Sequence, residues 1–188
     1  MKLEQSLKYI GASIAAGRHW RAAMNEPHRY YHTLAHVEAM LSHIPAGQES
    51  KELVAAIWLH DIVYNPAASD SEEQSALRAL ADLKYTLIDR DMVADLICGT
   101  KLHEGGSKTQ NLLNDLDLGI LRASRAAYAH YCKQIREEYA HVPETQYRPG
   151  RAAILKRFNE RHLFKTPFFE HLEAAAHANL EWEIKSLA

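Results

Sequence analysis

Apolar residues recur every three or four positions over most of the chain, which is the spacing that buries one face of an α-helix. This spacing occurs at Leu3, Leu7, Ile10 and Ile14, and it predicts helices over residues 34–44, 53–64, 92–97, 112–121 and 128–139. No segment alternates apolar and polar residues at a period of two, so little or no β-sheet is expected. The pattern therefore predicts an all-α fold.

Proline, glycine and capping residues divide the predicted helices. Asn65-Pro66 is a common stop after an apolar run. Ser69-Asp70-Ser71, followed by two glutamates, is typical of a helix start. We expect Pro143 and Pro149-Gly150 to interrupt the later part of the chain, and Thr166-Pro167 to open a last helix.

Composition indicates one domain, formed by residues 1–188, that is large enough to bury its own core. The net charge of -2 gives no general attraction to a nucleic acid duplex or an anionic membrane, and no apolar run is long enough to span a bilayer. Two cysteines provide no disulfide framework, and the first residues lack a signal-peptide pattern, so we expect a cytoplasmic protein. A homodimer is compatible with these data. The unusual feature is histidine, with twelve residues, because this side chain binds metals and transfers protons near neutral pH.

His60 and Asp61 lie in an apolar run that is suited to a buried helix. An ionised aspartate is costly to bury without a partner, and a divalent cation would compensate its charge. Neighbouring helical positions differ in direction by about 100°, but the different lengths of the two side chains allow them to converge on one ion. A buried hydrogen bond between His60 and Asp61, or an arginine paired with Asp61, is the alternative.

His32 and His36 are four residues apart and can share one face of a helix, as in many metal sites. If Thr33 caps the helix instead, His36 lies in the first turn and His32 in the preceding loop, where it is free to transfer protons. Two surface histidines near a helix start would give the same spacing.

Asp115 and Asp117 also lie within an apolar run, where a buried carboxylate needs a partner. Asp115 can serve as the N-cap of this helix, which leaves Asp117 as the inward-facing carboxylate. We therefore prefer Asp117 as the residue that joins a metal site.

Taken in order, His36, His60-Asp61 and Asp117 resemble the hallmark of the HD-domain superfamily of metal-dependent phosphohydrolases. The resemblance covers nearly the whole chain and is strongest to a subgroup of small bacterial proteins described as predicted HD-superfamily phosphohydrolases. It rests on residues 29–36, 59–64, 100–103, 115–118 and 134–139, with Arg151 and residues 179–180. It implies a single-domain helical bundle of the HD-domain type. It also implies one divalent ion (Mn, Fe, Co, Ni, Zn or Mg) bound by His36, His60, Asp61 and Asp117, and hydrolysis of a small phosphate ester, for example a nucleotide.

Residues 31–36 also resemble the Tyr-His-Asn-x-x-His signature of cyclic-nucleotide phosphodiesterases, although Thr33 replaces the asparagine. That resemblance assigns His32 as the general acid that protonates the leaving oxygen. The subgroup usually carries Asn-Glu-x-x-Ser-Ala where this chain has residues 71–76, which assigns Glu72 to orienting or deprotonating the attacking water. An ordinary acid in the first turn of a helix is the alternative for Glu72.

Basic residues complete the predicted substrate site. Lys101 is expected to stabilise phosphate charge and His103 to contact phosphate or a second metal, although a loop with both is also typical of a solvated surface. Arg136 and Arg151 are candidate phosphate clamps, because a guanidinium binds phosphate through two hydrogen bonds. Pairing with nearby glutamates is their alternative. Arg29, in the first similar segment, is assigned to substrate binding with them.

Two other functions remain as alternatives. An iron oxygenase of the HD type needs two further histidines between the His60-Asp61 pair and Asp117, and only His103 lies there, which favours a single metal. A metal-stabilised binding or signalling domain without turnover would keep the metal ligands but has no need of His32 and Glu72.

Overall fold

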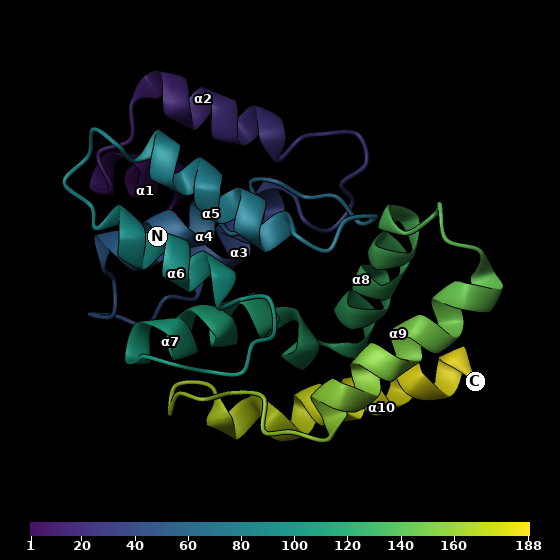
Figure 1. Cartoon of the computed structure of the whole chain (residues 1–188). Helices are drawn as coiled ribbons and strands as arrows, with labels where there is room; N and C mark the ends of the chain where they lie inside the picture. The colour runs from purple at the N-terminus through teal and green to yellow at the C-terminus, as the bar shows by residue number, and fades with distance from the viewer.

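The computed structural model describes all 188 residues and contains only helices, which confirms the predicted all-α fold (Figure 1). The elements in chain order are α1 (Leu3–Tyr9), α2 (Ile14–Ala23), α3 (Leu34–Ser42), α4 (Lys51–Leu59), α5 (Ser71–Asp82), α6 (Arg90–Cys98), α7 (Lys108–Asp117), η1 (Leu118–Arg122), α8 (Arg125–Glu138), α9 (Glu144–Asn159), η2 (Glu170–Leu172) and α10 (Glu173–Leu187), where η denotes a 3-10 helix. None of these helices combines the length and the hydrophobicity that crossing a bilayer requires.

The helix α4 lies at the centre of the fold, and every side chain from Leu53 to Leu59 is buried. It contacts α3, α5, α6 and α7. A helix that is apolar on all sides is stable only when other elements surround it. The buried apolar side chains form one cluster of 35 residues that extends from Ile10 to Leu180.

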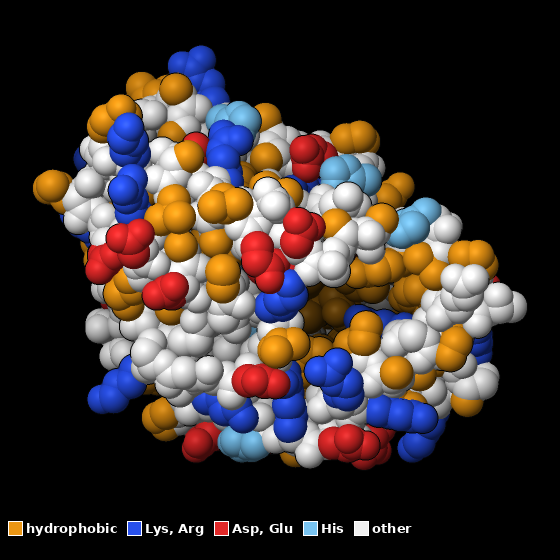
Figure 2. Space-filling view, in the orientation of Figure 1, with side chains coloured by type: hydrophobic (Ala, Val, Ile, Leu, Met, Phe, Trp, Pro, Cys, Tyr) orange, Lys and Arg blue, Asp and Glu red, His pale blue; other side chains and the backbone are white.

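The three C-terminal helices form the other side of the molecule. Helix α10 packs along α9 and also contacts α8 and η1. Glu183 on α10 joins them, because its buried carboxylate accepts hydrogen bonds from the Tyr128 hydroxyl on α8 and from Arg151 on α9. Figure 2 shows a hollow between this side and the N-terminal helices, with apolar side chains inside it and charged side chains along its rim.

The first apolar stretch forms two helices rather than one helical face. Helix α1 ends at Tyr9, and Gly11 adopts a φ of +70°, which glycine reaches without strain. Ser13 then caps α2 by accepting a hydrogen bond from the Ala16 N–H. Ile14 is consequently 77% exposed, although its spacing from Leu3 suggested a common buried face.

Two helix ends also differ from the sequence prediction. Helix α4 ends at Leu59, five residues before Tyr64, so that His60 and Asp61 follow the helix instead of lying inside it. The last helix begins at Glu173, because a turn and η2 follow Thr166.

Pro149 and Gly150 do not interrupt the chain as we expected, because both lie within α9. A proline inside a helix costs about 3 kcal/mol relative to alanine. Tertiary contacts on either side of the proline offset this cost: Arg148 donates hydrogen bonds to carbonyl oxygens at the end of α10, and Arg151 pairs with Glu183.

Candidate metal centre

His36 enters the site from the first turn of α3. The Thr33 side chain accepts a hydrogen bond from the Ala35 N–H and caps this helix, so His32 lies in the preceding loop. His36 is buried, and its Nε2 lies 3.2 Å from Nε2 of His60. The sequence allowed either a cap at Thr33 or a helix that carries both His32 and His36. The structure has the Thr33 cap.

His60 and Asp61 meet because the chain leaves the helix after Leu59. The His60 Nδ1 lies 3.0 Å from the carbonyl oxygen of Ile57. Since a carbonyl oxygen only accepts, Nδ1 carries a proton, and Nε2 of the neutral ring presents its lone pair to the site. Asp61 Oδ2 lies 3.0 Å from this Nε2.

Asp117, at the end of α7, brings a second carboxylate to the two imidazoles. Its Oδ1 lies 3.0 Å from His36 Nε2 and 3.7 Å from His60 Nε2. Its Oδ2 lies 2.8 Å from His103 Nε2. His103 has a φ of +51°, a region that residues other than glycine rarely adopt, and this conformation places its ring against Asp117. His103 thus orients Asp117, and it also lines the adjoining cavity, where the sequence predicts a contact with phosphate or a second metal.

Each charged side chain of this cluster shifts the pKa of its neighbours. Burial alone would lower the pKa of His60, but the carboxylates of Asp61 and Asp117 outweigh burial and raise this pKa to about 9. Burial would raise the pKa of Asp61, but His60 and His32 hold it below its usual range. The pKa of Asp117 is also lowered, by His60 and His103 against the effect of burial. Both aspartates are therefore ionised at neutral pH.

The residues of this cluster fit a divalent cation. One ligand atom from each of His36, His60 and Asp61 lies within 4.8 Å of the other two, and Asp117 adds its carboxylate beside them. Two imidazole Nε2 atoms at 3.2 Å repel each other unless they share a proton or a cation. Two carboxylates balance a charge of +2, and a mixed nitrogen and oxygen set suits Mn, Fe, Co, Ni or Zn.

Glu138, at the end of α8, orients His32 beside the cluster. Its Oε1 accepts the backbone N–H groups of Tyr30, Tyr31 and His32 at 2.7–3.0 Å. Its Oε2 lies 2.7 Å from His32 Nδ1 and accepts the Tyr64 hydroxyl at 2.8 Å. Because an ionised carboxylate only accepts, His32 Nδ1 carries a proton, and Nε2 is the nitrogen that remains for a ligand.

The His32–Glu138 pair is electrostatically matched. Burial would lower the pKa of His32, but Asp61 and Glu138 outweigh it, so this pKa is raised. Burial would raise the pKa of Glu138, but the hydrogen bond and charge of His32 bring it to about 2. His32 consequently holds its second proton more firmly than a free histidine, which favours the role of a proton donor at neutral pH.

A cavity of about 660 Å³ adjoins the cluster. Asp61 and Asp117 border this cavity together with His32, whereas His36 and His60 do not. The carboxylates therefore form the side of the cluster that faces the cavity, and the imidazoles lie behind them. A cavity of this volume is of the size that binds small molecules.

Glu72 and Lys101, which the sequence analysis assigns to the substrate site, border the same cavity. Lys101 Nζ pairs with Glu73 Oε1 at 2.5 Å and donates to the Ser69 carbonyl oxygen, while Glu72 Oε2 is 4.0 Å away. The Lys101–Glu73 pair is solvent-exposed and therefore weak.

Arg151 also borders the cavity, but its charge is already paired. Its Nε and Nη2 donate to the Glu183 carboxylate, and Nη2 also donates to the Tyr131 hydroxyl. Arg151 can hold the cavity wall in place and add positive potential to the cavity. Two of its three guanidinium nitrogens already donate to Glu183 and Tyr131.

Arg29 does not border the cavity, although it was assigned to substrate binding. Its guanidinium is buried and donates to the carbonyl oxygens of His32, Asp61 and Ile62. Buried carbonyl oxygens need such donors, because the chain is irregular on both sides of the site. Arg29 therefore joins the loop that carries His32 to the turn that carries Asp61.

Arg136 is likewise absent from the cavity wall. It donates to the Glu144 carboxylate and to the carbonyl oxygens of Tyr139 and Val142. Its role is to close the turn between α8 and α9, so the predicted phosphate clamp is not supported at this position.

Asp115 is buried and lies on the other side of α7. It is not the N-cap that we expected, because Ser107 caps this helix. The Asp115 carboxylate instead accepts the backbone N–H groups of Lys165 and Thr166 and the Thr166 hydroxyl. Asp117 is the aspartate of this pair that lies beside the imidazoles.

Glu138 and Tyr64 are the site residues that the sequence analysis did not single out. A periodic signal for Glu138 is present, because it continues the buried stripe of Tyr128, Tyr131 and Ile135 along α8. The loop that Glu138 contacts is more than 100 residues away in the chain and Tyr64 is 74 residues away, so periodicity indicates burial but not function.

Searches of protein-family models, curated proteins and solved structures give no match to this chain. The site is therefore defined by its own geometry. Two imidazoles and two carboxylates meet at the ends of α3, α4 and α7, and an oriented histidine faces the adjoining cavity.

Proposed function

We propose that the protein is a metal-dependent phosphohydrolase that acts on a small phosphate ester, for example a nucleotide. The main support is the meeting of His36, His60, Asp61 and Asp117 at one edge of a cavity that His32 also borders. These four residues would hold the divalent ion. When bound, such an ion lowers the pKa of a water molecule and polarises a phosphoryl oxygen.

His32 is proposed to protonate the leaving oxygen. Glu138 holds Nδ1, which fixes the ring and leaves the protonated Nε2 for the substrate. A carboxylate orients the catalytic histidine in the same way in serine hydrolases. The Glu138 carboxylate favours the protonated ring, which keeps this proton in place until the leaving oxygen becomes basic enough to take it.

Lys101 and Glu72 are proposed to act on the substrate side of the cavity. The exposed Lys101–Glu73 pair contributes little stability, so Lys101 can exchange this partner for a phosphate oxygen. Glu72 borders the cavity close to Lys101 and is proposed to orient the attacking water.

A phosphatase assay with defined metals tests the proposal. Metal-free protein is loaded in turn with Mn, Fe, Co, Ni, Zn or Mg and supplied with p-nitrophenyl phosphate, bis-p-nitrophenyl phosphate or nucleotides. We expect hydrolysis with at least one metal. Asp61→Asn should lower metal affinity and kcat/KM by about 100-fold or more, since even changes outside the ligand set act on a scale of about 10–100-fold.

Asp70→Asn is the matched control, because Asp70 is an exposed aspartate that accepts a hydrogen bond only from Gln74. The metal assignment is wrong if Asp61→Asn keeps full metal content and activity. If metal binds at the cluster and no ester is hydrolysed, a metal-stabilised binding domain is the better description. Oxygen consumption by the iron-loaded protein would favour an oxygenase instead.

A further inference from the structure

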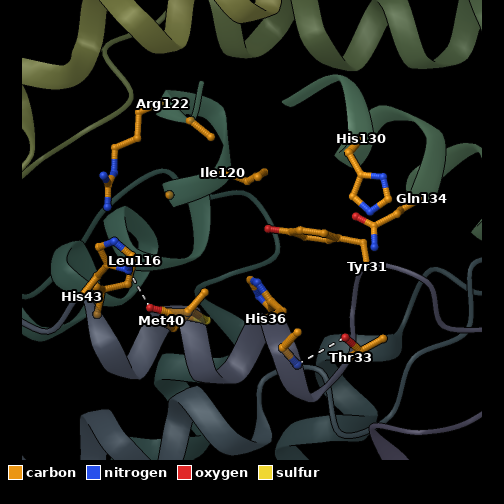
Figure 3. A pocket seen from close by; sticks show the side chains of 14 residues that line it. Tyr31, Thr33, His36, Met40, His43, Leu116, Ile120, Arg122, His130 and Gln134 are labelled. Atoms are coloured by element: carbon orange, nitrogen blue, oxygen red, sulfur yellow. Dashed lines mark hydrogen bonds between the residues drawn. The ribbon is translucent and has the colours of Figure 1, made fainter. Parts of the chain in front are cut away.

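A second cavity lies on the other side of Tyr31 from the proposed active site. This cavity, called here the Arg122 groove, has a volume of about 520 Å³ and lies between α3, η1 and α8 (Figure 3). Its apolar wall includes Met40, Leu116 and Ile120. Tyr31 and Ile120 border both cavities, so their side chains separate the groove from the proposed active site.

Arg122 is the only fully charged side chain in this groove, because no aspartate or glutamate lines it. One face of its guanidinium lies over Phe169, with 5.1 Å between the guanidinium carbon and the ring centre. Its Nε is buried and has no hydrogen-bond partner, and the side chain forms no ion pair. Figure 3 shows the side chain extending from η1 towards the end of α3 that carries His43.

Arg122 is partly exposed, but its buried Nε has no partner, which is energetically unfavourable in the free protein. A buried donor without a partner costs about 1–3 kcal/mol, and more when the group is charged. Arginine stays protonated, so proton loss does not relieve the cost. A negatively charged ligand would satisfy these donors and would remove the unbalanced charge.

Neutral polar groups and apolar groups form the remainder of the groove. His130 and Gln134 project from α8 at the end away from Arg122 (Figure 3). Gln134 is partly committed, because its Nε2 donates to the Tyr30 carbonyl oxygen at 2.7 Å. A single cation beside a long apolar wall complements a molecule that has one anionic end and an apolar body.

We propose that the Arg122 groove binds a small organic anion, with a carboxylate or phosphate on Arg122 and an apolar body against Met40, Leu116 and Ile120. Charge complementarity selects the anion, and the apolar wall favours it over inorganic phosphate. The metal-cluster residue His36 also lines this groove, whereas Arg122 does not line the cavity that Asp61, Asp117 and His32 border. The proposal does not depend on phosphohydrolase activity.

Calorimetric titration of the metal-free chain of 188 residues tests this proposal. Octanoate and octyl phosphate are the probes and distinguish the two anionic groups, while 1-octanol and inorganic phosphate test the apolar body and the anion alone. We expect octanoate or octyl phosphate to bind more tightly than either control. Arg122→Met should weaken that binding about tenfold or more, which corresponds to the loss of one charge-assisted contact.

Arg125→Met is the matched control, because the Arg125 guanidinium also lies over an aromatic ring, that of Trp182, but outside the groove. Arg122→Met should fold normally, since Arg122 makes no hydrogen bond. Ala39→Trp, which fills the groove from α3, should abolish binding without changing its charge.

Equal binding of octanoate and octyl phosphate by the wild type and Arg122→Met would overturn the proposal, as would equally tight binding of 1-octanol. Asp61→Asn should still bind the probes, which separates this site from the metal centre. Loss of binding in Asp61→Asn would contradict a separate site, whatever the outcome of the phosphatase assay. A change of oligomeric state in Arg122→Met during sedimentation would show that a second copy of the chain covers the groove, and the proposal would be wrong.

Discussion

Among single residues, Glu138 has the largest effect on the arrangement of the site. Its buried carboxylate accepts three consecutive backbone N–H groups, from Tyr30 to His32, as well as the His32 ring and the Tyr64 hydroxyl. One side chain therefore fixes both the loop that carries His32 and the orientation of its imidazole. Its loss would leave several buried donors without an acceptor.

We predict that Glu138→Gln lowers the pKa of His32, because the charge and hydrogen bond that help to raise it are removed. The alkaline limb of the pH–activity profile should move to lower pH. NMR titration of the His32 ring protons measures the pKa directly. Glu137→Gln, a change at the exposed neighbour, is the control, and an unchanged His32 pKa in Glu138→Gln would contradict the assigned contact.

Glu138→Gln should also change how the free energy of unfolding depends on pH in the acid range. The pKa of Glu138 falls from an ordinary value of 4.5 to about 2 on folding. Its contribution to stability is therefore complete above pH 4.5 and is lost as the pH falls towards 2. Urea unfolding should show Glu138→Gln less stable by about 1–3 kcal/mol at neutral pH, with a smaller loss relative to the wild type in acid.

The two aspartates of α7 provide a second residue-level prediction. Asp115→Ala should lower the free energy of unfolding by about 1–3 kcal/mol, because Lys165 and Thr166 lose their acceptor, and it should keep metal affinity. Asp117→Ala should instead lower metal affinity about tenfold or more. Metal titration and urea unfolding of both variants separate the two roles, and metal loss in Asp115→Ala alone would reverse the assignment.

At the scale of elements, helix ends decide where the site residues lie. The sequence predicts the helices that carry His36, Asp117 and Glu138, because their apolar spacing is regular. It does not predict the end of α4, since Ile62 after the helix is also buried, and hydrophobicity does not change at Leu59. The convergence of His60 and Asp61 depends on this end.

The sequence also predicts an interruption at Pro149-Gly150 that α9 does not have. Pro149-Gly150 has the composition of a turn, and local preference favours an interruption. Contacts of α9 with α10 outweigh that preference. Distant contacts also decide the role of Arg29, because its acceptors include the carbonyl oxygens of Asp61 and Ile62, which neighbouring residues do not predict.

Gly150→Ala should stabilise α9. Gly150 lies inside the helix, and an added Cβ would have no heavy atom within 4 Å. Alanine in a helix interior is favoured over glycine by about 0.5–1 kcal/mol. A thermal melt should show a rise of about 1–4 °C for a chain of this length. A lower melting temperature would contradict this prediction.

On the scale of the whole molecule, the candidate metal centre joins elements that are far apart in the sequence. Its ligands come from α3, from the turn after α4 and from the end of α7. Glu138 from α8 completes the adjoining loop. A cation bound at this point would hold the central helices together, and its effect should therefore appear in global unfolding.

Metal binding should raise the melting temperature of the wild type. At a free metal concentration of about 100 times Kd, the stabilisation is about 2.7 kcal/mol. For a protein of this size this corresponds to a shift of about 5–10 °C. Differential scanning calorimetry with added metal and with a chelator measures it. Asp61→Asn should show little or no shift, and an equal shift in both proteins would place the stabilising metal elsewhere.

The contact between Glu138 and residues 30–32 also has a consequence for the order of folding. It spans more than 100 residues of chain. Contacts between such distant segments form late, because closing a long loop has the largest entropic cost. All four proposed metal ligands precede residue 138, so a chain emerging from the ribosome carries the complete proposed ligand set before α8 exists. Under the proposed function, the nascent protein would thus acquire its cation first and its oriented proton donor last, and an unfinished chain would bind metal without the means to turn over substrate.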